Sequence, residues 1–172
     1  MKDKNQALHA ALDSIDPEED HRILYVASSY GLGMLFIKEA GYQVQGIDID
    51  KRALRFCQEQ GLNVRRMNAA HMEFEDESFD MVISRDFIVG DYQPEQHAER
   101  VSILNEMHRV LKTGGRAVFT TMQPPSVRGM IGFPSQDDIE ASQFNPASMT
   151  EKTIVLTNGT QNFNVPILYY FK

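Results

Sequence analysis

The sequence is poor in cysteine and has no long hydrophobic run. Its single cysteine, Cys57, cannot form an internal disulfide, and no paired Cys or Cys/His spacing suggests a metal site. The first twenty residues are polar and acidic, and no apolar segment approaches the roughly 20 residues that cross a bilayer. We therefore expect a soluble, cytoplasmic protein without a metal, a disulfide or membrane association.

Basic residues are also outnumbered. There are 17 Lys and Arg against 24 Asp and Glu, and the net charge is −7. Affinity for phosphate backbones depends on clustered Lys and Arg, so the sequence argues against an extended nucleic-acid interface. With 172 residues, of which 42% are hydrophobic and 24% charged, the chain has the proportions of one globular domain.

Short apolar runs alternate with helical patterns along most of the chain. Residues 23–27 form a continuous apolar run, which is typical of a parallel strand buried on both faces. Further strands are predicted at residues 44–49, 63–67, 79–84 and 116–122, and helices at residues 5–12, 32–40, 51–60 and from Pro94 onward. Asp50 is placed to cap the third of these helices, and Gly41 and Gly61 are placed to end two of them. This alternation predicts βαβ units and a mostly parallel sheet.

The helix that Pro94 opens is predicted to be the longest. It carries apolar residues at steps of three and four and breaks at Gly114-Gly115. Its stripe consists of Val101, Leu104, Met107, His108 and Leu111. We interpret His108 as a helix-packing residue and His71 as a loop residue, not as catalysts.

The last quarter of the chain has a different pattern. Only residues 136–143 look helical after the proline-rich stretch that begins at Gln123. Asn158-Gly159 is the strongest short-range hairpin signal in the sequence, and it joins residues 153–157 to residues 160–170. Pro166 should restrict pairing, so we expect the useful second strand at residues 167–171. The parallel sheet should therefore end in an antiparallel hairpin.

The turn after the first strand carries the main functional signal. A P-loop is excluded because no Lys-Ser/Thr pair follows Gly31 or Gly33. A dinucleotide fingerprint would place Leu32 at its third glycine, which blocks the close approach of helix and strand. A spacing of small residues remains at Ala27, Ser29 and Gly31, and Asp48 ends the second strand, where a carboxylate can accept from ribose hydroxyls. These residues fit a nucleoside better than a dinucleotide.

Four linked segments give a resemblance to a known family. They are ILYVASSYGLG, VQGIDID, MNAAHMEFEDESFDMVIS and ILNEMHRVLKTGGRAVFTT, in this order between about residues 22 and 122. In this region the sequence resembles the class I S-adenosylmethionine-dependent methyltransferases, especially those with a minimal methyltransferase domain. The resemblance implies an α/β fold of the Rossmann-like methyltransferase type, a doubly wound three-layer sandwich whose seven-stranded sheet ends in a hairpin. It implies one methyltransferase-like domain over residues 1–172, with an entry segment at 1–20, a cofactor-binding core at 22–122 and a connection with the hairpin at 123–172.

The resemblance also assigns cofactor contacts by position. The cofactor would be S-adenosyl-L-methionine, and S-adenosyl-L-homocysteine would be its product. Ala27, Ser29 and Gly31 would line the methionine part, Asp48 would hold the ribose, Ile49 would pack on the adenine, Asn68 would accept from the adenine amino group, Ala69 would offer its amide, and Ser84 with Arg85 would border the pocket where cofactor and substrate meet.

Two departures leave a second hypothesis open. Tyr25 stands where the family has an acidic residue, and Ala27 and Ser29 replace two glycines of the turn. The chain is therefore either an active enzyme or a catalytically inactive, methyltransferase-like binding or regulatory subunit.

The acceptor has no recognisable motif. Ser84-Arg85-Asp86-Phe87 does not match the Asn/Asp-Pro-Pro-Tyr motif of family members that methylate amino groups. The connection over residues 85–96 and the adjacent His97 are the expected place of substrate contact. We expect a small-molecule acceptor with no identified general base, and the chain can act alone, as a homodimer or with a partner subunit.

Overall fold

The computed structural model describes residues 20–87, 94–120, 133–157 and 162–172. The predicted helix at residues 5–12 and the Asn158-Gly159 turn lie outside these residues. The strands are β1 (Arg22–Val26), β2 (Gln43–Asp48), β3 (Val64–Arg66), β4 (Phe79–Arg85), β5 (Leu111–Thr120), β6 (Thr150–Thr157) and β7 (Asn162–Phe171). The helices are α2 (Leu32–Glu39), α3 (Lys51–Glu59), α4 (His97–Val110) and α5 (Gln136–Glu140), with short 3₁₀ turns at Pro94–Gln96 and Pro146–Ser148.

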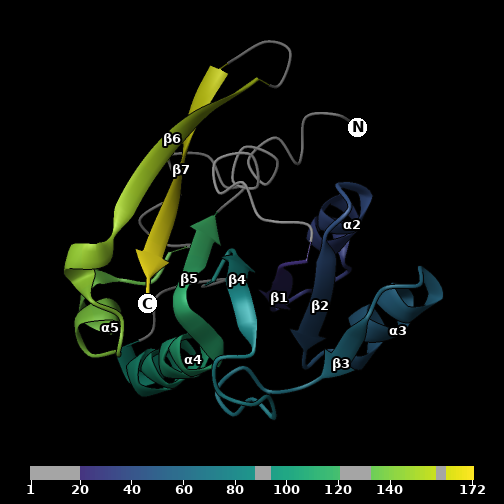
Figure 1. Ribbon diagram of the computed structural model, residues 1–172, viewed down its shortest axis with the longest axis horizontal. Helices are drawn as coiled ribbons and strands as arrows, with labels where there is room; N and C mark the ends of the chain where they lie inside the picture. The colour runs from purple at the N-terminus through teal and green to yellow at the C-terminus, as the bar shows by residue number, and fades with distance from the viewer. Residues whose placement is uncertain (1–19, 88–93, 121–132, 158–161) are drawn as a thin grey trace.

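The described strands form one seven-stranded sheet in the order β3-β2-β1-β4-β5-β7-β6 (Figure 1). All neighbours from β3 to β5 are parallel, whereas β7 is antiparallel to both β5 and β6. The predicted fold class is confirmed, including the hairpin at the end of the sheet. The order reverses between β1 and β4, so the carboxyl ends of β1, β2 and β4 lie next to one another at one edge.

Local sequence signals set the ends of α2 and α3. The side chain of Asp50 accepts from the backbone amide of Arg52 at 2.8 Å, as an N-cap should. Gly41 and Gly61 follow the two helices with φ values of 95° and 68°, in the left-handed region that favours glycine. The predicted caps of these helices are confirmed.

The end of α4 differs from the prediction. The sequence predicts a helix that runs to Gly114-Gly115 with Leu111 on its apolar stripe, but α4 ends at Val110 and Leu111 begins β5. The amides of Glu77 and Ser78 donate to the carbonyls of Arg109 and Val110 at 3.0 and 2.9 Å, so a distant loop satisfies the last helical carbonyls. The buried residues of α4 are Arg100, Leu104, Met107 and Val110.

The prediction that Pro166 restricts pairing is also wrong. The hairpin pairs continuously from Thr150↔Tyr169 to Thr157↔Asn162, and Pro166 lies opposite Thr153. Among the described residues, β5 reaches β7 only as far as Thr120↔Ile167. Within the described residues, the part of β7 before Ile167 therefore pairs with β6 alone, and a strand paired on one side can contain a proline.

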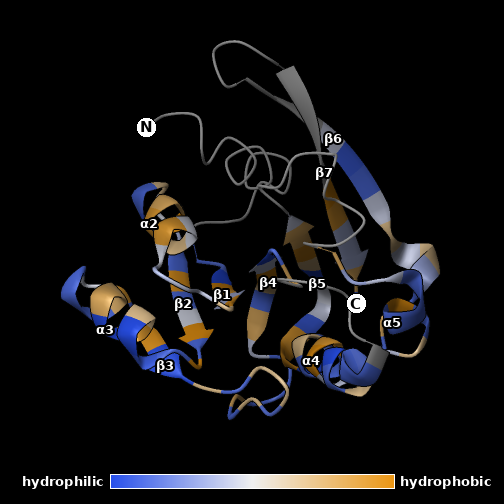
Figure 2. Cartoon of the chain, turned by 180° about the vertical axis from the view of Figure 1, so that it is seen from behind, coloured by the Kyte–Doolittle hydropathy of each residue, from blue (hydrophilic) through white to orange (hydrophobic). Residues whose placement is uncertain are grey.

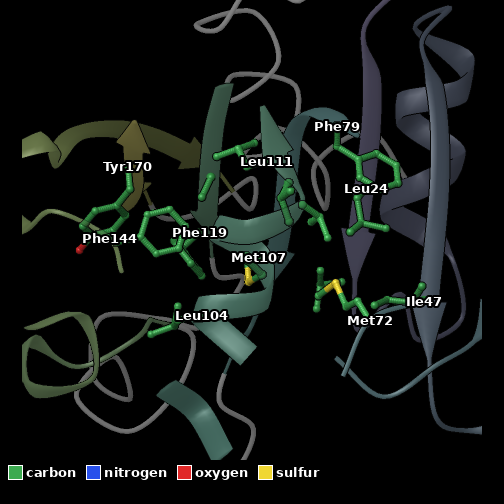
Figure 3. Packing of buried hydrophobic residues seen from close by; sticks show 14 of the residues in the cluster. Leu24, Ile47, Met72, Phe79, Leu104, Met107, Leu111, Phe119, Phe144 and Tyr170 are labelled. Atoms are coloured by element: carbon green, nitrogen blue, oxygen red, sulfur yellow. The ribbon is translucent and has the colours of Figure 1, made fainter. Parts of the chain in front are cut away.

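The core has two halves, one on each face of the sheet. Ile23 and Tyr25 pack with Met34 of α2 and Leu54 of α3, whereas Leu24 and Val26 pack with Leu104 and Met107 of α4. This alternation along β1 produces the three layers visible in Figure 1, and Figure 3 shows the second half around Leu24, Met107 and Phe119. In Figure 2, α3 and α4 carry both hydrophobic and hydrophilic residues, as helices that cover a sheet do. Within the described ranges, we find no helix that is both long and apolar enough to cross a membrane.

Candidate cofactor site

Three residues of the turn between β1 and α2 have positive φ values, and only one of them is a glycine. Ala27, Ser29 and Gly31 have φ values of 56°, 46° and 74°. Ala27 and Ser29 are exposed, so their β-carbons do not crowd the interior. Gly31 is different, because a β-carbon there would lie 2.5 Å from Leu62 Cδ1 and 2.8 Å from Cys57 Sγ. The turn thus tolerates side chains at its first two small positions and excludes one at the third.

Asp48 links this turn to the end of β2. Its Oδ2 accepts from the amide of Ser29 at 2.7 Å, and its Oδ1 accepts from the amide of Asp50 at 2.9 Å. Each carboxylate oxygen has further acceptor capacity, so the carboxylate can also accept from a ligand hydroxyl. The carboxylate therefore shapes the turn as well as being placed to bind a ligand.

A pocket of about 170 Å³ opens beside Asp48. It combines apolar walls with two carboxylates and an amide, and Glu99 and Ile103 of α4 close one side. Its lining residues are Ala27, Ile47, Asp48, Ile49, Met67, Asn68, Ala69, Glu99 and Ile103. Pockets that enclose a whole drug-sized ligand usually measure about 300–1,000 Å³. This pocket suits a nucleoside end, with apolar walls for a base and Asp48 for a ribose.

The loop after β3 forms the floor of this pocket. Met67 donates its amide to the carbonyl of Asp48 at 3.0 Å, which joins the loop to β2. Asn68 Oδ1 accepts from the amide of Ala70 at 2.9 Å. The oxygen that the resemblance assigns to the adenine amino group therefore uses one of its two lone pairs within the loop.

Two residues of α4 hold this loop in place. Glu106 Oε2 accepts from the amide of Met72 at 2.6 Å, and Arg109 donates to the carbonyls of Met72 and Phe74 at 2.8 Å each. Arg109 also bonds Glu106 and Asp76, both at 2.7 Å. The hydrogen bond from Arg109 lowers the pKa of Glu106, against the opposing effect of burial. The Glu-x-x-Arg spacing in the fourth sequence segment is thus explained by a clamp that positions the pocket floor.

Tyr25 and Ser84 are not among the residues that line the pocket. The Tyr25 side chain is buried, its hydroxyl has no hydrogen-bond partner among the described residues, and burial raises its pKa. A β-carbon on Gly33 would overlap the Tyr25 hydroxyl and ring, so only glycine fits over this ring. Ser84 pairs with Val26 across β4 and β1 and is also buried, and no described residue forms a hydrogen bond with its hydroxyl.

The structure describes part of the segment that is expected to contact the substrate. Arg85 Nε lies 3.9 Å from Asp86 Oδ2, and Asp91 and Tyr92 lie outside the described residues. His97 Nδ1 lies 2.7 Å from Asp138 Oδ1, and Arg100 Nε lies 2.9 Å from Asp138 Oδ2. Burial alone would raise the pKa of Asp138, but hydrogen bonds from Arg100, His97 and Ser135 lower it. This cluster fastens α5 to α4 in the structure.

The pocket brings together five of the eight residues expected to bind the cofactor. They are Ala27, Asp48, Ile49, Asn68 and Ala69. Ser29 and Gly31 shape the turn, and Ser84 is buried under the sheet edge. Sequence reasoning missed Ile47, Met67, Glu99 and Ile103 as lining residues. Glu99 and Ile103 are four residues apart on α4, a spacing that puts them on one face, but no local signal says which loop that face meets.

The strand order β3-β2-β1-β4-β5-β7-β6, with β7 antiparallel to its neighbours, is that of a Rossmann-like methyltransferase fold, and a pocket lies at the carboxyl edge of its sheet. Comparison with known families agrees: the sequence profile described as "Methyltransferase domain" matches residues 24–119. The chain belongs to this methyltransferase domain family.

Individual relatives share the fold or part of the sequence. The chain is 30% identical over 109 residues to a phthiotriol/phenolphthiotriol dimycocerosates methyltransferase from Mycobacterium ulcerans, covering 60% of this chain and 38% of that protein. Among solved structures, an S-adenosylmethionine-dependent methyltransferase from Methanosarcina mazei has a TM-score of 0.69 at 19% identity, covering 94% and 96% of the two chains. A phosphoethanolamine N-methyltransferase from Haemonchus contortus, solved with S-adenosylhomocysteine, has a TM-score of 0.68 at 19% identity, covering 96% of this chain and 52% of that one. The chain thus spans about two fifths of the curated relatives that it matches.

Proposed function

We propose that this domain transfers a methyl group from S-adenosylmethionine to a small-molecule acceptor. The observation that carries the proposal is the pocket at the carboxyl edge, where Ala27, Asp48, Ile49, Asn68 and Ala69 meet. These residues come from three separate segments, and the resemblance to the family assigns all of them to one cofactor.

Asp48 and the apolar walls would bind different parts of the cofactor. The Asp48 carboxylate would accept from the ribose hydroxyls, since both oxygens retain acceptor capacity beside the amides of Ser29 and Asp50. Ile49 is 65% exposed, and Ile103 lines the same pocket, so the two side chains can cover the faces of a base.

The residues at the edge would mainly position the reactants. When bound, the cofactor supplies a methyl group on a sulfonium that is already a good leaving group. Transfer then depends on in-line geometry and exclusion of water, and a base is needed only for a protonated nucleophile. The lack of an obvious catalytic base among the described residues is therefore compatible with methyl transfer.

One observation favours the second hypothesis, a binding or regulatory subunit without catalysis. Tyr25 replaces the acidic residue of the family, and its buried hydroxyl brings no charge to the cofactor's ammonium group. The conformation of the turn favours the active enzyme, because Ala27 and Ser29 adopt the left-handed conformations that glycines would supply.

Isothermal calorimetry with S-adenosylmethionine and S-adenosylhomocysteine tests the proposal. Binding of both, followed by methyl transfer to any member of an acceptor panel, is the expected result. Binding of the product with no transfer to any acceptor would favour the regulatory subunit. If neither compound binds, the enzyme hypothesis is rejected.

The methyl acceptor and the oligomeric state are properties of the whole protein. We propose a small-molecule acceptor because the curated relative from M. ulcerans is described as acting on phthiotriol and phenolphthiotriol dimycocerosates. Sedimentation of the purified chain, alone and with its product, would distinguish a monomer from the homodimer that the sequence leaves open.

A further inference from the structure

Asn68 offers an adenine amino group a weaker acceptor than a carboxylate would. Its Oδ1 accepts from the amide of Ala70 at 2.9 Å, which leaves one lone pair on a neutral amide oxygen, and its Nδ2 is a donor. The 6-amino group of adenine is also a donor. The resemblance places an acidic acceptor at this position, so a charged acceptor has to come from another residue of the pocket.

Glu99 is the other carboxylate in the pocket besides Asp48. It lies in the first turn of α4, one turn before Ile103, which lines the same wall. Within the described part of the chain, Glu99 makes no hydrogen bond or ion pair, so its oxygens are available to a ligand. The Asp48 carboxylate accepts from the amides of Ser29 and Asp50, and its remaining acceptor capacity is assigned to the ribose.

We propose that the carboxylate of Glu99 accepts a hydrogen bond from the 6-amino group of the cofactor's adenine, in place of an acid at position 68. The proposal rests on the proposed function and identifies the residue that selects the base. A carboxylate attracts a 6-amino group but opposes a 6-oxo group, because two acceptors then face each other without a proton. The pocket should therefore prefer adenine to hypoxanthine.

The decisive comparison uses S-adenosylhomocysteine and its 6-oxo analogue, S-inosylhomocysteine, as calorimetric probes. Hydrogen bonds to charged groups contribute about 1.5–3 kcal/mol, so the wild type should prefer the 6-amino compound by about tenfold or more. Glu99→Gln should lose most of this preference, because an amide can present either a donor or an acceptor. Glu99→Lys should invert the preference, since an ammonium group donates to the 6-oxo oxygen.

Two further variants distinguish recognition of the base by Glu99 from a general effect of charge and from an effect on the stability of α4. Glu95→Gln removes a similar exposed charge four residues earlier, outside the pocket lining, and should keep the wild-type preference. Adding Asn68→Asp to Glu99→Gln should restore the preference for the 6-amino compound. A role of Glu99 only at the helix N-terminus predicts instead a lower melting temperature with an unchanged ratio of the two affinities.

The outcomes distinguish this inference from the proposed function. A wild type that binds neither compound rejects the proposed function. If the wild type binds S-adenosylhomocysteine but Glu99→Gln and Glu99→Lys keep the wild-type ratio of the two affinities, the role of Glu99 is rejected. The proposed function is then unaffected.

Discussion

Ala27 and Ser29 adopt backbone conformations that L-residues rarely take. A left-handed conformation costs an L-residue roughly 1–2 kcal/mol, and glycine avoids most of that cost. The turn keeps this conformation because the amide of Ser29 is tied to Asp48 and the amide of Ser28 to the carbonyl of Ile47. The side chains at residues 27 and 29 therefore store strain at the pocket.

Ala27→Gly should stabilise the protein by about 0.5–1 kcal/mol, since relief of strain exceeds the added entropy of the unfolded chain. Urea denaturation would measure the change. Ala53→Gly is the matched control, because Ala53 lies buried inside α3 and its replacement should destabilise by about 1 kcal/mol. Destabilisation by Ala27→Gly would show that the turn is not strained.

Asp48 combines a structural and a binding role. Asp48→Ala should weaken S-adenosylhomocysteine binding by about tenfold or more and destabilise the fold by about 1–3 kcal/mol, because two backbone amides lose their acceptor. Calorimetry and urea denaturation would measure the two effects. Asp50→Ala, which removes the N-cap of α3, should cost about 1 kcal/mol with unchanged affinity. Unchanged affinity in Asp48→Ala would contradict the ribose assignment.

At the scale of elements, α4 connects the core to the pocket. One face of the helix buries Leu104 and Met107 under the sheet, Glu99 and Ile103 form a wall of the pocket, and Glu106 with Arg109 holds the loop after β3. A change in the clamp should therefore alter the pocket although neither clamp residue lines it.

The clamp predicts a pH dependence of stability. Because the pKa of Glu106 is lower in the folded than in the unfolded state, its contribution is present above the unfolded pKa of about 4.3 and is lost as the pH falls through the folded pKa. Glu106→Gln should thus have a lower melting temperature than the wild type at pH 7. The difference between the two melting temperatures should become smaller toward pH 3. Glu59→Gln, at an exposed ion pair with Arg55, should show almost no difference at either pH. A pH-independent difference would reject the ionic contribution of Glu106.

At the scale of the whole molecule, ligand binding should be coupled to stability. The pocket joins the ends of β1 and β2 to α4 and the loop after β3, so a ligand that fills it binds only the folded chain. At one hundred times its dissociation constant, S-adenosylhomocysteine should add about 2.7 kcal/mol, which corresponds to roughly 5–10 °C in melting temperature. Differential scanning fluorimetry would measure this shift. Adenine alone, at the same concentration, should give a smaller shift, and equal shifts would contradict a ribose contact at Asp48.

The sequence by itself determined the order of strands and helices, the caps at Asp50, Gly41 and Gly61, and the small residues of the first turn. These features depend on neighbours within a few residues, through hydropathy period, capping hydrogen bonds and allowed φ values. The position of Asp48 at the end of a strand indicated a ribose contact, and the resemblance to the family added Ile49, Asn68 and Ala69 to the same candidate site.

Only the tertiary structure decided which distant groups complete these patterns. The last carbonyls of α4 accept from Glu77 and Ser78, and this ends the helix before Leu111, although the local periodicity continues. Pro166 fits because, in the part of the chain that the structure describes, it pairs with β6 alone and the pairing of β5 with β7 reaches only to Ile167. Glu99 enters the pocket because α4 crosses beside the loop after β3, and a helix face alone does not specify its partner. The physical reason is common to all three: each contact joins segments brought together by packing of the whole sheet.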